Sequence, residues 1–184
     1  MNNHKYAIVV RTSGGLAVVS DPNICNVSMF TNEELTIDAG YEKMITFLQQ
    51  IIPNTKLIAR EVAASYCPGK FDLCINNKKI AGLSQKRLGQ TTVIMAYISL
   101  SGNQSDRCTL IKEFYQLSKA DNTYPKIKNK SMTTLHDLNI DTCHISELKK
   151  SNTNITKQFN KWLLSNKQLK QQIKITLQNR QIGR

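Results

Sequence analysis

The sequence predicts one α/β (α+β) domain in which a mixed central β-sheet is flanked by helices. Short runs of β-branched and aromatic residues, which favour strands, dominate the first hundred residues. Two longer segments place apolar residues at helical spacing among these runs and after them. Strands that come first, with helices interleaved and then trailing, are typical of a layered sheet-and-helix domain, and 184 residues suffice for its core.

The first predicted strands lie on either side of a glycine-rich turn. Residues 6–10 and 16–19 are short β-branched runs, and residues 11–15 (RTSGG) interrupt them. After a turn at residues 21–23, apolar and polar residues alternate over residues 25–30. This alternation predicts a third strand with one buried face.

A helix and a possible strand come next. Asp38 is a candidate N-cap for a helix over residues 39–52, whose apolar positions follow helical spacing. Pro53 would end this helix. Residues 56–60 could then form a further strand.

Three more strands and a second helix complete the predicted core. The strands span residues 71–75, 79–84 and 92–100, and Asn76-Asn77 is typical of a tight hairpin turn between the first two. Ser105 is a candidate N-cap for the helix over residues 105–119.

The C-terminal part is predicted to be helical and to follow a polar linker. Residues 121–130 form the linker, and short helices are expected at 134–138 and 145–150. An amphipathic pattern predicts a final helix over residues 156–178. The predicted division is therefore a catalytic core over residues 1–120 and, over residues 121–184, a linker and a helical segment that packs on the same domain.

The formal net charge of +12 favours an anionic partner: nucleic acid, a membrane surface or an acidic protein. The lysines are scattered, without interleaved aromatic residues, so general nucleic-acid binding is a weak hypothesis. No apolar run is long enough to span a bilayer. A solvated basic surface and a specific face for an acidic partner both fit the charge.

Five cysteines occur, and no CxxC pair or secretion signal accompanies them. This pattern predicts reduced thiols in a cytoplasmic protein. The three histidines are not at zinc-ligand spacing with the cysteines, so no metal site is expected.

Cys67 is the strongest candidate nucleophile. It lies in the segment SYCPGK, where Pro68-Gly69 predicts a rigid turn that holds the sulfur near solvent. A nucleophilic cysteine must be a thiolate, which a nearby ammonium would favour. The candidate cations are Lys70, Lys78 and Lys79. The alternative is that Cys67, like most cysteines, is a small buried apolar residue.

Gly14-Gly15 could allow a ligand to approach the backbone closely, although such pairs are usually plain turns. The sequence has neither GxxxxGK[ST] nor GxGxxG, which argues against a nucleotide-binding loop.

Taken together, three blocks carry a family resemblance: residues 10–21 (VRTSGGLAVVSD), 65–73 (SYCPGKFDL) and 78–87 (KKIAGLSQKR). They resemble, in order and at plausible spacing, the superfamily of lipoate–protein ligases, octanoyltransferases and biotin ligases. The GGLAVV and YCPG forms are most similar to the octanoyl-[glycine cleavage H protein]:protein N-octanoyltransferases, or lipoyl amidotransferases, of Gram-positive bacteria. That branch has a further segment before the arginine–glycine motif, so the resemblance implies an N-terminally shortened member.

The resemblance implies a role for each matching residue. Cys67 would take the acyl group as a thioester, and Lys79 (or Lys78, if the register shifts by one) would favour the thiolate and carry the proton. The acyl and lysyl-arm pocket would be lined by Arg11, Ser13, Gly14 and Gly15, and room for the acyl chain would come from Ala17, Ala81 and Gly82.

It also implies the reaction and the partners. The octanoyl or lipoyl group would pass from the lysine of glycine cleavage H protein to a lipoyl-domain lysine of a 2-oxoacid dehydrogenase E2 subunit. No ATP, metal or other cofactor, nucleic acid or membrane would take part. Two alternatives remain open: an ATP-dependent lipoate–protein ligase of the same fold, and a non-catalytic fragment that binds lipoyl domains.

Overall fold

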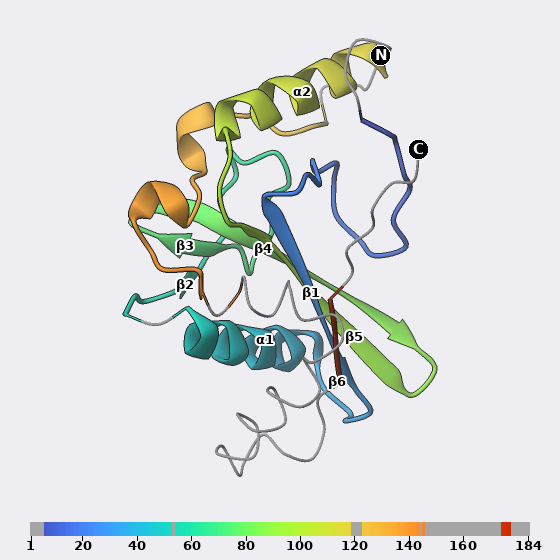
Figure 1. Ribbon diagram of the computed structural model, residues 1–184. Helices are drawn as coiled ribbons and strands as arrows, with labels where there is room; N and C mark the ends of the chain where they lie inside the picture. Colours follow the sequence, from blue (N-terminus) through green and yellow to red (C-terminus); the bar gives the residue numbers. More distant parts are fainter. Residues whose placement is uncertain (1–5, 53, 119–122, 144, 146–173, 178–184) are drawn as a thin grey trace.

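The computed structural model describes residues 6–52, 54–118, 123–143, 145 and, for the backbone, 174–177. Its six-stranded sheet has the order β2-β3-β4-β5-β1-β6 (Figure 1). Along the chain the elements are β1 (Ile24–Thr31), α1 (Ile37–Ile51), β2 (Ile58–Ala59), β3 (Leu73–Ile75), β4 (Lys78–Leu88), β5 (Thr91–Ser99), α2 (Gln104–Leu117), the 3₁₀ turns η1 (Asn129–Ser131) and η2 (His136–Leu138), and β6 (Lys174–Leu177). The predicted α/β fold class is confirmed.

All neighbouring strands of the sheet pair antiparallel, so the sheet is antiparallel and the prediction of a mixed sheet was wrong in this respect. Among the described residues, parallel pairing is limited to an isolated bridge between Lys79 and Met132. The predicted hairpin turn is confirmed, because Asn76 and Asn77 adopt φ values of 49° and 63°, as a type I′ turn requires. This turn places Lys78 and Lys79 at the start of β4, next to β3.

The N-cap of helix α1 lies two residues before the predicted cap. Thr36 is the N-cap, and its Oγ1 accepts a hydrogen bond of 3.1 Å from the N–H of Ala39. Asp38, predicted as the cap, lies instead in the first turn, where its negative charge favours the helix dipole. The buried side of α1 includes Met44 and Leu48 and packs against β4 and β5.

Helix α2 is capped by Asn103, not by Ser105 as predicted. Asn103 Oδ1 accepts from the N–H groups of Ser105 and Asp106, at 2.9 and 3.3 Å. The two helices lie on different sides of the sheet (Figure 1). Each side has its own apolar cluster, the larger with α1 and the smaller around Tyr66, Tyr97 and α2.

The two strands predicted before β1 do not form. Val9 and Val10 are 63% and 90% exposed, and residues 6–19 have no strand partner among the described residues. Residues 16–19 run instead toward α2, where the N–H of Ala17 donates to the Tyr115 hydroxyl at 3.1 Å. Strand propensity was insufficient there because a strand needs a neighbour to satisfy its backbone groups.

The segment predicted as a polar linker packs on the core where the structure describes it. Ile127 is buried, the N–H of Lys128 donates to the carbonyl of Ala64 at 2.9 Å, and the N–H of Thr133 donates to that of Lys79 at 3.0 Å. The helix predicted over residues 134–138 is represented by the short turn η2.

The final predicted helix is wrong over residues 174–177, which form strand β6 against β1. The rest of it, and residues 146–150 of the preceding predicted helix, lie outside the described residues, as does Pro53. None of the helices in the described part of the chain combines the length and apolar character that crossing a membrane requires.

Candidate functional site

Cys67 lies in the loop that joins β2 to β3, and its side chain is only partly buried. The carboxylate of Asp72 holds this loop from inside: Oδ2 accepts from the N–H groups of Val62 and Gly69, both at 3.2 Å. The N–H of Asp72 donates in turn to the carbonyl of Gly69 at 3.0 Å. A turn does follow Cys67, but Lys70 and Phe71 form it rather than Pro68-Gly69 as predicted, and a buried carboxylate braces it.

The sulfur faces the glycine-rich segment, which is far away in the sequence. The N–H of Leu16 donates to Cys67 Sγ at 3.2 Å, and Arg11 Nη2 donates to it at 3.7 Å. Arg11 Nη2 also donates to the carbonyl of Leu16 at 2.7 Å. One backbone N–H and one guanidinium thus meet at the candidate nucleophile.

Gly15 makes this approach possible. Its φ of +105° is unfavourable for residues with a side chain. A Cβ at this position would lie 2.3 Å from Arg11 Nη2 and 3.2 Å from Cys67 Sγ. The second glycine of the Gly-Gly pair is therefore required by close packing, whereas a Cβ on Gly14 would meet nothing within 4 Å.

The side chain of Lys79 contacts Cys67 at its backbone carbonyl rather than at its sulfur. The side chain is only 6% exposed, and Nζ contacts Asp72 Oδ1 at 2.7 Å and Ser65 Oγ at 3.2 Å. Nζ also donates to the carbonyl oxygen of Cys67. These three contacts bind the lysine, the loop and the buried carboxylate into one unit.

The structure distinguishes the three candidate lysines. Lys78 is exposed, and Lys70 forms a surface ion pair of 2.5 Å with Asp38. Lys79 alone of the three is buried beside the Cys67 loop. The side chain of Lys79 also passes close to Gly82, where a Cβ would lie 3.4 Å from Cε.

Burial raises the pKa of Asp72, and the Lys79 ammonium and the N–H groups of Gly69 and Val62 oppose this shift. Such a buried pair costs desolvation free energy, which only good geometry and additional hydrogen bonds can offset. Both partners have those bonds here. The Lys79–Asp72 pair can therefore stay buried and hold the Cys67 loop in place.

Tyr66, next to Cys67, connects the loop to β5. The Tyr97 hydroxyl donates to the carbonyl of Val19 at 2.7 Å, so the Tyr66 hydroxyl is the donor in its 2.9 Å bond to Tyr97. Burial raises the pKa of Tyr66 to about 12 and that of Tyr97 well above its ordinary value. Both phenols therefore stay protonated and join the Cys67 loop to the segment that follows Leu16.

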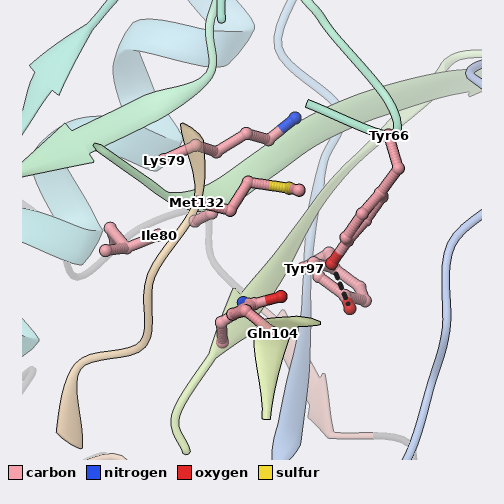
Figure 2. Close-up of a pocket in the computed structure, with 8 residues that line it drawn as sticks. Tyr66, Lys79, Ile80, Tyr97, Gln104 and Met132 are labelled. Atoms are coloured by element: carbon pink, nitrogen blue, oxygen red, sulfur yellow. Dashed lines mark hydrogen bonds between the residues drawn. The ribbon is translucent and has the colours of Figure 1, made fainter. Parts of the chain in front are cut away.

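A small cavity lies behind Lys79, as Figure 2 shows. Gln104 Nε2 donates to Ser99 Oγ at 2.8 Å and to the carbonyl of Thr133 at 3.1 Å. Gln104 Oε1 has no hydrogen-bond partner among the described residues. The cavity is lined by Tyr66, Lys79, Ile80, Ala81, Tyr97, Ser99, Gln104 and Met132.

The structure brings several of the predicted site residues together. Arg11 and Gly15 lie at Cys67 Sγ, Lys79 lies beside Gly82, and Ala81 lines the cavity behind Lys79. Ala17 packs in the smaller apolar cluster, and Ser13 and Gly14 belong to the same glycine-rich segment. The roles of all these residues in binding a substrate stay predictions.

Asp72, Ser65 and the N–H of Leu16 were not predicted as site groups. An acidic residue within a short apolar strand segment (FDLCI) is unusual, and it could have drawn attention to Asp72. A serine and a backbone N–H have no comparable signal in the sequence, because their roles depend on what the fold places beside them.

Cys67 also differs from the other cysteines. Cys25, Cys74 and Cys108 are buried, and Cys143 is exposed. Burial raises the pKa of the Cys74 and Cys108 thiols, which disfavours their reactive thiolate form.

Comparison with known proteins finds close relatives. Residues 1–159 match the family described as lipoyl protein ligase A/B catalytic domain. An octanoyl-[GcvH]:protein N-octanoyltransferase of Anoxybacillus flavithermus is 40% identical over 145 residues, which cover 75% of this chain and 53% of the relative. One of Lysinibacillus sphaericus is 38% identical, with the same shares covered. A lipoyl-[GcvH]:protein N-lipoyltransferase of Listeria monocytogenes is 38% identical, over 72% of this chain and 51% of the relative.

The chain spans about half the length of the curated relatives that it matches. The family match, in contrast, includes all three sequence blocks, and the structure brings Arg11, Cys67 and Lys79 from these blocks to one place. The chain therefore belongs to the lipoyl protein ligase A/B catalytic domain family.

Proposed function

We propose that this chain is an acyltransferase that moves an octanoyl or lipoyl group between protein lysines through a thioester on Cys67. The observation that carries the proposal is the environment of the partly exposed Cys67 sulfur. The Arg11 guanidinium contacts the sulfur, and the buried Lys79 anchors the loop that carries it. The relatives are named for transfer of octanoyl or lipoyl from GcvH to protein, which supports the same chemistry.

The proposed first step breaks an amide. The Cys67 thiolate attacks the carbonyl carbon of the acylated donor lysine, so a C–S bond forms as the C–N bond breaks. The leaving amine must take a proton, and the Lys79 ammonium is the proposed donor because it already contacts Cys67.

The second step reverses these changes with another lysine. A neutral amine of the acceptor attacks the thioester, an amide forms, and the sulfur leaves as the thiolate. The proton lost by the attacking amine returns to Lys79. Since one amide replaces another, the proposed reaction needs no ATP, metal or other cofactor.

The proposed donor is glycine cleavage H protein, and the proposed acceptors are lipoyl domains of 2-oxoacid dehydrogenase E2 subunits. Lipoyl carriers are acidic in general, and the net charge of +12 favours acidic partners. The proposed setting is the cytoplasm, which fits a sequence whose five cysteines include no CxxC pair. In the proposed arrangement, Arg11, Ser13, Gly14 and Gly15 border the lysyl arm, and Ala17, Ala81 and Gly82 leave space for the acyl chain.

Intact-mass spectrometry of the full chain, mixed with octanoylated H protein, tests the proposal. We expect an adduct of one octanoyl group that hydroxylamine removes, as it removes thioesters. Cys67→Ser should abolish this adduct, and the matched variant Cys143→Ser, at an exposed cysteine, should retain it.

Other outcomes would overturn the proposal in distinct ways. A Cys67→Ser variant that transfers octanoyl at the parent rate would exclude the thioester. Product made from free octanoate and ATP would favour a ligase of the same fold. Binding of H protein with no adduct and no transfer would identify a non-catalytic binding module.

A further inference from the structure

Lys79, Arg11 and the N–H of Leu16 differ in whether they have a hydrogen-bond donor available for Cys67 Sγ. An ammonium has three N–H donors, and Lys79 Nζ has three acceptors: Asp72 Oδ1, Ser65 Oγ and the carbonyl oxygen of Cys67. The lysine therefore has no donor left for the sulfur in this arrangement. Its contact with Cys67 goes to the backbone.

The Arg11 guanidinium has donors to spare. It carries five N–H groups, and its Nη2 contacts both the carbonyl of Leu16 and Cys67 Sγ. The N–H of Leu16 is a second donor to the sulfur, at 3.2 Å. The bond from Arg11 to the Leu16 carbonyl therefore holds the guanidinium beside the peptide that contacts Sγ.

The charges around the sulfur also indicate that Arg11, and not Lys79, acts on Sγ. The groups that face Cys67 and its loop are Arg11 from the glycine-rich segment, Lys79 from β4, Asp72 before β3, and the neighbouring Tyr66. Lys79 and Asp72 pair at 2.7 Å, so their charges largely offset each other. Tyr66 stays neutral below a pH of about 12. Arg11 is the positive charge at the sulfur that no described acidic group offsets.

We propose that Arg11, together with the N–H of Leu16, holds Cys67 as a thiolate, and that Arg11 is thus a catalytic residue distinct from Lys79. This inference adds a residue to the proposed acyl transfer, and the catalytic role of Arg11 rests on that proposed function. The thiol proton leaves to solvent before the carrier binds, because Cys67 is partly exposed. Lys79 then keeps its protons for the leaving amine. Arg11 therefore stabilises the thiolate, and Lys79 transfers the proton.

The pH dependence of Cys67 alkylation tests whether Arg11 stabilises the thiolate. The full chain is treated with iodoacetamide from pH 5 to pH 10, and the rate at Cys67 is followed by peptide mass spectrometry. We expect Arg11→Gln to slow alkylation at neutral pH, while the limiting rate at high pH stays the same. At neutral pH the rate should then fall about fivefold to tenfold.

Two matched variants complete the experiment. Lys78→Gln removes an exposed cation at the start of β4 and should leave the profile unchanged. Arg11→Lys keeps the charge and should restore most of the alkylation rate at neutral pH, whereas a merely structural role for the guanidinium would not be rescued in this way. Arg11 is itself exposed, so its substitution leaves the core intact.

Superposed profiles for Arg11→Gln and the parent would overturn the inference, as would an equal shift in Lys78→Gln. Alkylation needs no acyl carrier, so this result is independent of the proposed function. An Arg11-dependent profile in a chain that forms no octanoyl adduct would overturn the proposed acyl transfer and support the inference about Arg11.

Discussion

Lys79 and Asp72 form a buried ion pair of 2.7 Å next to the Cys67 loop, with side-chain exposures of 6% and 2%. The pair is the physical link between the loop and the sheet, because Lys79 belongs to β4 and Asp72 braces the loop backbone. The position of the sulfur therefore depends on two charges that stabilise each other.

Removing one charge of this pair should be costly. In Asp72→Asn, the Lys79 ammonium stays buried without a counterion, so we expect a loss of about 3 kcal/mol in the free energy of unfolding. Urea denaturation measures this loss. Asp38→Asn breaks the surface pair with Lys70 and should cost no more than about 1 kcal/mol. Equal effects of the two substitutions would contradict the structural role given to Asp72.

The two glycines of the glycine-rich segment should respond differently to alanine. Gly15→Ala places a Cβ 2.3 Å from Arg11 Nη2 at a φ of +105°, so the guanidinium must move away from the sulfur. Gly14→Ala meets nothing within 4 Å. We expect Gly15→Ala to slow octanoyl adduct formation at least about tenfold, since small displacements of a catalytic group cost large factors in rate. Gly14→Ala, whose added Cβ approaches neither Arg11 nor Cys67, should slow adduct formation less than Gly15→Ala; equal losses in both would exclude the crowding argument.

Stability should fall in alkaline solution because of the tyrosine pair. In the folded chain the pKa of Tyr66 is about 12, against an ordinary value of 10.0. Between these values the unfolded chain releases the proton and the folded chain keeps it, so rising pH favours unfolding. We expect this one group to cost about 1 kcal/mol by pH 11.

Urea denaturation at pH 9 and pH 11 measures the effect. Tyr66→Phe should reduce the loss of stability between these two pH values. Tyr6→Phe, at a tyrosine that is 48% exposed, is the matched control and should keep the parent behaviour. The account fails if Tyr66→Phe loses stability with pH as steeply as the parent.

The five cysteines should separate into two classes by reactivity. Cys25, Cys74 and Cys108 are at most 3% exposed, and burial raises the pKa of the Cys74 and Cys108 thiols. Iodoacetamide at neutral pH should therefore label Cys67 and Cys143 in the native chain, and all five after unfolding. Peptide mapping by mass spectrometry reports each site. Labelling of Cys108 as fast as that of Cys67 in the native chain would contradict the burial described here.

Several features depended on local sequence alone and were predicted from it. Asn76-Asn77 tolerates positive φ, so the hairpin turn between β3 and β4 was predictable from two adjacent residues. Helix α1 followed from apolar spacing, although Thr36 rather than Asp38 caps it. The turn after Cys67 was predicted at Pro68-Gly69 but forms at Lys70 and Phe71. The three motif blocks were sufficient to identify the family.

Only the tertiary structure decided which groups meet at Cys67. The N–H of Leu16 comes from 51 residues away and carries no side-chain signal, and Arg11 was predicted to line a pocket rather than to contact the sulfur. Lys78 and Lys79 are neighbours in the sequence, but a strand points successive side chains to opposite faces, so only Lys79 turns inward to Asp72. Propensity also predicted strands at residues 6–10 and 16–19 and a helix through 174–177. These predictions were wrong because pairing partners, which only the folded sheet supplies or withholds, decide whether a segment becomes a strand.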